Sequence, residues 1–95
     1  MGNVLSYMDV VQKFEDAYHK CIIIVVKHSY GDSLIITEEL ECSDIGNKFS
    51  ITDLHDTQIT INKSCIQSVC LEHEVLNEEI VFDLGSSKIT FIIGN

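Results

Sequence analysis

The sequence predicts an α+β fold in which one N-terminal amphipathic helix, at about residues 6–20, is followed by six or seven short antiparallel strands between about residues 21 and 93. Two observations carry this prediction. Apolar residues first recur at spacings of three and four, which is the period of a helix, and then fall into short runs separated by Gly, Ser, Asn and Asp, as in strands joined by turns. We expect these strands to form a small barrel or a strongly bent sheet. The whole chain, 1–95, is expected to be a single α+β domain.

The predicted helix has a recognisable start and one apolar face. Ser6 and, three residues later, Asp9 resemble a capping box in which Asp takes the place of the preferred Glu. An apolar stripe at helical spacing is expected to face the core. Its members are Val4, Met8, Val11, Phe14 and Tyr18.

The strands are predicted from the apolar runs that follow. Residues 21–26 form the longest unbroken run and are expected to be a central strand buried on both faces, because they are β-branched and lack polar alternation. Gly31 should supply a positive φ in the next turn. Residues 34–42 are expected to form one strand whose inward face is Leu34, Ile36, Leu40 and Cys42. Later strands are predicted near 49–51 and at 58–62, 64–71, 80–84 and 88–93.

The order of these elements is similar to that of one known architecture. A helix followed by a strongly bent sheet of short strands is the order of the Sm-like small barrels, and Ile59 to Val69 resembles their last strands. A pleckstrin-homology-like sheet is the alternative, although that fold places its long helix at the C-terminus. Both resemblances concern fold alone. The acidic charge of the chain stands against RNA binding.

Charge is the most informative global property of the chain. Its 15 acidic residues face 6 lysines and no arginine, which gives a formal net charge of −9 at pH 7. Such a surface repels polyanions, so we expect no direct binding to nucleic acid. It favours rapid, salt-sensitive encounter with a basic protein partner, and a nucleic-acid-binding protein is one such partner.

The densest acidic groups lie beside apolar residues and are predicted to form a partner-binding patch if strand pairing brings them to one side. The other interpretation is a solvated face that prevents edge-to-edge aggregation of strands. The candidate partner-binding residues are Glu38, Glu39, Glu41, Glu72, Glu74, Glu78 and Glu79.

The sequence carries no signature of catalysis, so we expect that the protein is not an enzyme. A Gly-rich phosphate loop, a G-x-S-x-G elbow and an H-E-x-x-H motif are all missing. Closely spaced Cys pairs of the zinc-knuckle kind are also missing, so neither a metal nor a cofactor is expected. The four thiols are expected to be reduced and mostly buried, and they belong to Cys21, Cys42, Cys65 and Cys70.

Two sequence patterns bear on membrane attachment and on cellular location. Gly2 opens a segment that fits the N-myristoylation pattern. One acyl chain without a basic patch gives only marginal membrane binding, so stable membrane attachment is not expected. No secretory signal precedes the apolar run at 21–26, and a cytoplasmic location is therefore predicted.

The resulting hypothesis is a small acidic intracellular binding protein that occupies the basic surface of a protein partner. Inhibitors, immunity proteins and phage anti-defence proteins such as anti-CRISPRs act in this way, some of them as nucleic-acid mimics. The alternative is a structural or assembly subunit that homo-oligomerises through edge strands. In that alternative the outward apolar positions Ile35, Val81 and Ile92 take part in the contact between copies.

Overall fold

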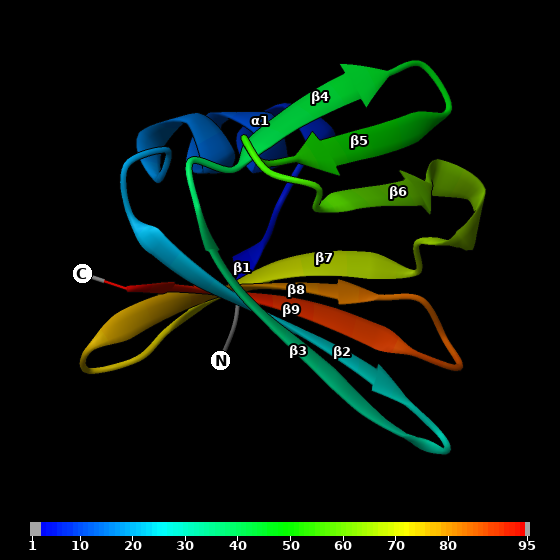
Figure 1. Cartoon of the computed structure of the whole chain (residues 1–95). Coiled ribbons are helices and arrows are strands. Elements are labelled where there is room, and N and C mark those ends of the chain that lie inside the picture. Colours follow the sequence, from blue (N-terminus) through cyan, green and yellow to red (C-terminus); the bar gives the residue numbers. More distant parts are fainter. Residues whose placement is uncertain (1–2, 95) are drawn as a thin grey trace.

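The computed structural model describes residues 3–94, and these form one α-helix and two antiparallel sheets (Figure 1). The helix and the smaller sheet lie in one layer and the larger sheet forms the other (Figure 1). The larger sheet contains, in spatial order, β1 (Asn3–Val4), β7 (Ser68–His73), β8 (Asn77–Asp83), β9 (Lys88–Gly94), β2 (Cys21–His28) and β3 (Gly31–Glu38). The smaller sheet contains β4 (Glu41–Ile45), β5 (Lys48–Thr52) and β6 (Gln58–Asn62). The helix α1 is Tyr7–Asp16, and a short 3₁₀ turn, η1 (Lys63–Cys65), joins β6 to β7.

The predicted α+β class is confirmed: a helix near the N-terminus is followed by antiparallel strands. The described residues form nine strands rather than six or seven, because β1 precedes the helix and the predicted strand at 34–42 is divided in two. The helix ends at Asp16 rather than near residue 20. A closed barrel is not found, because the strand pairings within residues 3–94 form two separate sheets. The larger sheet ends at β1 on one side and at β3 on the other. Gly2, the proposed acylation site, lies outside the described residues. Within those residues, no helix has both the length and the apolar character needed to cross a membrane.

Helix α1 begins as predicted but buries a different face. Ser6 accepts a hydrogen bond from the backbone N–H of Asp9, and the Asp9 carboxylate accepts one from the N–H of Ser6, so the capping box is confirmed. The buried positions are Val10, Phe14 and Ala17. Met8 is 83% exposed. The predicted stripe is therefore wrong at Met8, which lies almost opposite the buried face at 100° per residue. It is also wrong at Val4, which lies in β1 and is 77% exposed.

The predicted strand at 34–42 is divided between the two sheets. Glu39 has a φ of 57°, in the left-handed region that residues other than Gly rarely occupy, and it bends the chain out of the larger sheet. Residues before and after this bend cannot share a face. Leu34 and Ile36, which are 62% and 66% exposed, point away from the core, so their predicted inward orientation is wrong.

Strand β2 lies inside the larger sheet, between β9 and β3, but only one of its faces is sealed. Ile22 and Ile24 are fully buried, whereas Ile23 and Val25 are half-buried. The expectation of burial on both faces is therefore wrong, because nothing in the described residues covers the second face. The turn after β2 has the positive φ predicted at Gly31, which is 152°.

The two layers are joined through a chain of aromatic contacts. Phe14 of α1 meets Phe91 of β9 edge to face with ring centroids 5.0 Å apart. Phe91 contacts Phe82 of β8 at 5.6 Å, and Phe82 contacts Phe49 of β5 at 6.0 Å. All four rings are at most 1% exposed. Such pairs contribute about 0.5–1.5 kcal/mol each beyond the burial of area, so they fix the helix and the small sheet on the large one.

Candidate functional site

The face of the larger sheet that points away from α1 and the smaller sheet, which we call the outer face, is uncovered. In Figure 1 no element lies beyond it. Strand register places two rows of side chains across it. The first, called the aliphatic row, contains Leu34, Val25, Thr90, Val81, Cys70 and Val4. The second, called the mixed row, contains Ile36, Ile23, Ile92, Glu79 and Glu72.

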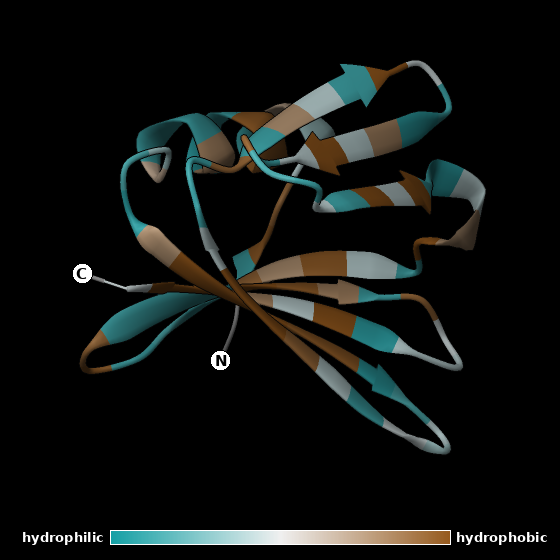
Figure 2. Ribbon diagram, in the orientation of Figure 1, coloured by the Kyte–Doolittle hydropathy of each residue, from teal (hydrophilic) through white to brown (hydrophobic). Residues whose placement is uncertain are grey.

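Most side chains of the two rows are in contact with solvent. Leu34, Ile36 and Val4 are 62%, 66% and 77% exposed, and the aliphatic residues between them are half-buried. Figure 2 shows hydrophobic residues along β2 and β9 and more hydrophilic ones toward the β2–β3 turn. Isolated exposed apolar residues are ordinary, whereas a row that continues across neighbouring strands makes this face a candidate interaction site.

Charged residues border the apolar part of the outer face. Beyond the aliphatic row, Asp32 and Lys27 lie opposite each other on β3 and β2, and Lys88 and Asp83 lie opposite each other on β9 and β8. At the other end of β3, Glu38 lies opposite Cys21. An apolar centre with a charged rim is the usual anatomy of a protein-binding surface.

Three of the predicted partner-binding residues come together at one side of this face. Glu79 and Glu72 are directly opposite each other on β8 and β7, and Glu74 follows in the β7–β8 turn. Partial burial raises the pKa of Glu79, and the charges of Glu74 and Glu72 raise it further, while Lys27 acts in the opposite direction. A positive group placed beside these carboxylates would relieve their repulsion.

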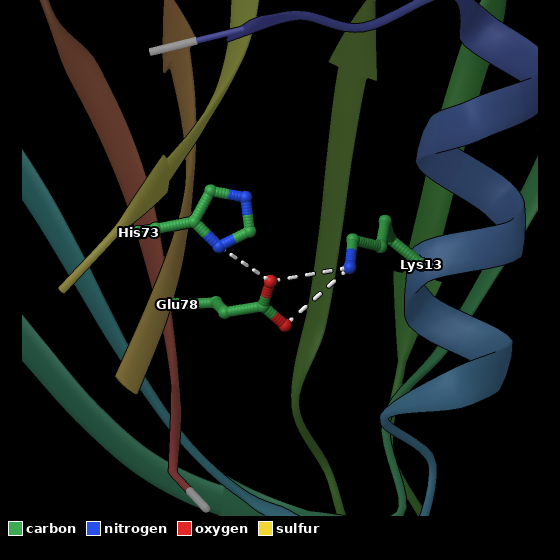
Figure 3. Close-up of polar contacts among 3 residues, drawn as sticks. All are labelled: Lys13, His73 and Glu78. Atoms are coloured by element: carbon green, nitrogen blue, oxygen red, sulfur yellow. Dashed lines mark hydrogen bonds and ion pairs between the residues drawn. The ribbon is translucent and has the colours of Figure 1, made fainter. Parts of the chain in front are cut away.

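Glu78 is adjacent to Glu79 in sequence but points to the opposite face of β8. Its carboxylate oxygens accept hydrogen bonds from Lys13 Nζ of α1 at 3.3 and 3.4 Å, and Oε2 lies 3.0 Å from His73 Nδ1 (Figure 3). This candidate is thus engaged within the protein. It ties the helix to the larger sheet.

The remaining candidates lie near the bend at Glu39. Glu38 is on the outer face, whereas Glu39 accepts a hydrogen bond from Tyr18 Oη at 3.4 Å and Glu41 begins β4. Partial desolvation raises the pKa of Tyr18, followed by the charges of Glu39 and Glu41. The predicted patch is therefore divided, and Glu38 alone of this group shares a face with Glu72 and Glu79.

Two cavities have titratable side chains in their linings. One of about 370 Å³ lies between α1 and β4 and includes Cys42, whose pKa burial raises to about 12, so its thiol is protonated at pH 7. Another of about 460 Å³ lies beside Thr37, Asp53 and His55. Asp53 accepts hydrogen bonds from Thr37 Oγ1 at 2.5 Å and from the backbone N–H groups of His55 and Thr57 at 2.9 and 3.1 Å. The Thr37 contact makes the largest contribution to lowering its pKa to about 2, so this carboxylate holds the loop rather than accepting a proton.

The cysteine and histidine side chains of the described residues do not form a metal-binding cluster. In the part of the chain that the structure describes, no three His, Cys, Asp or Glu side chains form a group that could hold a metal ion. All four cysteines are free thiols. Cys42 is buried, Cys70 is half-buried, and Cys21 and Cys65 are exposed, so the expectation of mostly buried thiols is wrong.

Sequence reasoning found part of the outer face. Val81 and Ile92 were expected to point outward, and they do. Ile35 packs against the core, so its predicted outward orientation is wrong. Leu34, Ile23 and Val25 were missed because an apolar strand residue gives no sign of which face of its sheet will be covered.

No protein-family model, curated protein or solved structure matches this chain.

Proposed function

We propose that this protein is a small acidic binding protein that occupies a basic surface of a protein partner through its outer face. The observation that supports this proposal is the uncovered aliphatic row, which Glu72 and Glu79 border on the side toward Glu38. The border on the other side carries both signs of charge, with Lys27 and Lys88 beside Asp32 and Asp83. An apolar partner surface that carries lysine or arginine beside it would bury the row and neutralise the carboxylates. The partner is a basic protein rather than nucleic acid, in keeping with the net charge of −9.

The proposed action is that of an inhibitor, an immunity protein or a phage anti-defence protein in the cytoplasm. In each of these classes the bound protein is blocked because its own basic site is covered. A nucleic-acid mimic is one form of this action, in which carboxylates take the positions of phosphates. The proposal involves no catalysis and no cofactor.

Affinity capture from the native cell with the intact protein, followed by binding measurements with the purified partner, tests this proposal. We expect affinity to fall as ionic strength rises, because the screening length shortens from about 30 Å at 0.01 M salt to about 8 Å at 0.15 M. The double variant E72Q/E79Q should bind more weakly. The control E15Q/D16N, which removes the same charge from α1, should not. An affinity that is unchanged by salt, or equally reduced in both variants, would contradict the proposal.

A second candidate function is an assembly subunit that homo-oligomerises through edge strands, as expected of an Sm-like or pleckstrin-homology-like small barrel. The position of β3 at the end of the larger sheet favours it. Light scattering distinguishes the two functions. A stable multimer at micromolar concentration would support the assembly subunit, and a monomer would count against it.

A further inference from the structure

Strand β3 is a long and unprotected edge. It pairs with β2 over all eight of its residues, Gly31–Glu38, without a bulge, and no strand of residues 3–94 pairs with its other side. The opposite edge of the sheet, β1, has only two residues. An edge strand presents a row of unpaired N–H and C=O groups, and proteins usually protect it with Lys, Pro or a bulge. None of these devices occurs in β3.

The side chains that β3 contributes to the outer face follow a simple order. They are Asp32, Leu34, Ile36 and Glu38, which is acidic, apolar, apolar, acidic. All four are exposed. A strand added to this edge would place its own alternate side chains beside them at about 4.5–5.5 Å between Cβ atoms.

A second copy of the chain is a poor occupant of this edge. Antiparallel pairing of two β3 strands over residues 32–38, with their outer faces aligned, would set Leu34 of one copy opposite Ile36 of the other. The same register would set Asp32 opposite Glu38 at both ends of the ladder. Like charges directly opposite each other destabilise a strand pair. The edge therefore repels itself in this register.

We propose that the β3 edge binds an extended segment of the partner protein by strand addition, and that this segment has the pattern basic-x-apolar-x-apolar-x-basic. This inference rests on the proposed function and names the part of the partner that is recognised. The basic residues lie opposite Asp32 and Glu38. The apolar residue opposite Leu34 extends the aliphatic row, and the one opposite Ile36 extends the mixed row. The pattern reads the same in both directions, so parallel and antiparallel addition offer the same contacts. Backbone hydrogen bonds supply affinity and the side chains supply specificity.

A synthetic peptide tests the pattern directly. The probe is an acetylated and amidated heptapeptide of alternating Thr and Val with Lys at both ends, and its control has Glu at both ends. Binding is followed by NMR shifts of the β3 amides of the whole protein. The Lys peptide should bind roughly tenfold more tightly than the Glu peptide, which is about 1.4 kcal/mol, because the charge pairs at both ends change from attractive to repulsive. Methylation of alternate peptide amides should abolish binding. Equal affinity of the two peptides would overturn the inference.

A charge reversal in the protein gives a second, independent test. In E38K, antiparallel self-pairing over residues 32–38 sets the introduced lysine opposite Asp32, so this variant should form a dimer at a concentration where the wild type is monomeric in sedimentation. The variant D32K/E38K carries like charges again and should stay monomeric. A wild-type dimer formed through β3, or an E38K variant that stays monomeric, would overturn the inference. If both tests fail while partner binding remains sensitive to salt and to E72Q/E79Q, the inference is lost and the proposed function stands.

Discussion

Glu78 and Glu79 are neighbours in β8, and replacing each with glutamine should change the free energy of unfolding in opposite directions at pH 7. Glu78 lies on the inner face within hydrogen-bonding distance of Lys13 and beside His73. Glu79 lies on the outer face opposite Glu72. E78Q removes attractive contacts and should destabilise the protein. E79Q removes a carboxylate whose charge the fold disfavours and should stabilise it.

The magnitude for E78Q follows from the solvation of its ion pair with Lys13. The two side chains are 25% and 27% exposed, and ion pairs that remain partly solvated contribute about 0.2–1 kcal/mol. For a domain of this size 1 kcal/mol shifts Tm by about 4–8 °C, so E78Q should lower Tm by roughly 1–8 °C. In a K13M background the same substitution should cost less, because the main partner of Glu78 is already gone.

The direction in which E79Q changes the free energy of unfolding follows from the raised pKa of Glu79. The folded state raises the pKa of Glu79 above its ordinary value of 4.5, so folding favours the protonated carboxyl group. The full stability is present below pH 4.5, and it is lost as pH rises through the folded pKa. E79Q should therefore be more stable than the wild type at pH 7 and equally stable at acidic pH.

Urea denaturation followed by circular dichroism at pH 7 and near pH 3.5 measures these changes in the free energy of unfolding. The set contains the wild type, E78Q, E79Q, K13M and K13M/E78Q. If E78Q and E79Q changed the free energy of unfolding by the same amount and sign at pH 7, the assignment of these residues to opposite faces would be refuted. An E78Q cost that persisted in full in K13M would refute the ion pair.

Three further predictions concern the core, the β5–β6 loop and the thiols. Phe82 is fully buried between Phe49 and Phe91, so F82A should cost about 3–5 kcal/mol in urea denaturation, while F82L should cost clearly less; equal costs would argue against close packing of the ring. T37V should raise the pKa of Asp53 from about 2 toward 3.8 in an NMR titration. The wild type loses the contribution of this carboxylate to stability only as pH falls toward 2, whereas T37V should lose it at higher pH. An unchanged pKa would show that the Thr37 hydroxyl does not lower the pKa of Asp53. A thiol reagent followed by mass spectrometry should label Cys21 and Cys65 in the folded protein, whereas Cys42 should react only on unfolding; early labelling of Cys42 would contradict its burial.

Local pattern was sufficient to predict several elements. Strand β6 has the predicted bounds, Gln58–Asn62, because its apolar and polar residues alternate cleanly. The strand predicted at 88–93 is β9, Lys88–Gly94, and Phe91 within it is fully buried. Ser6 caps α1 as expected, since a cap depends only on residues within one turn. In each case the information lies within a few residues of the element.

The features that depend on long-range pairing could not be predicted. The sequence near Glu39 does not indicate that the chain leaves one sheet for another, because Ile36, Leu40 and Cys42 continue an even spacing of apolar residues across it. Whether the strands close into a barrel is decided by pairing between distant segments. The division of the acidic candidates has the same cause. Glu78 and Glu79 look alike in the sequence, and only the covering of one face by α1 makes them different.

The larger sheet is assembled from both ends of the chain, and this has a consequence for folding. Strands β7, β8 and β9 form a local meander and β2 and β3 a local hairpin, but Ile22 pairs with Ile93, so the junction between β2 and β9 closes most of the polypeptide into a loop. Closure of so long a loop is entropically costly and slow compared with hairpin formation. The aliphatic row crosses this junction, so it is complete only after β9 has paired with β2. Partly folded states that contain only the hairpin and the meander therefore lack the continuous row.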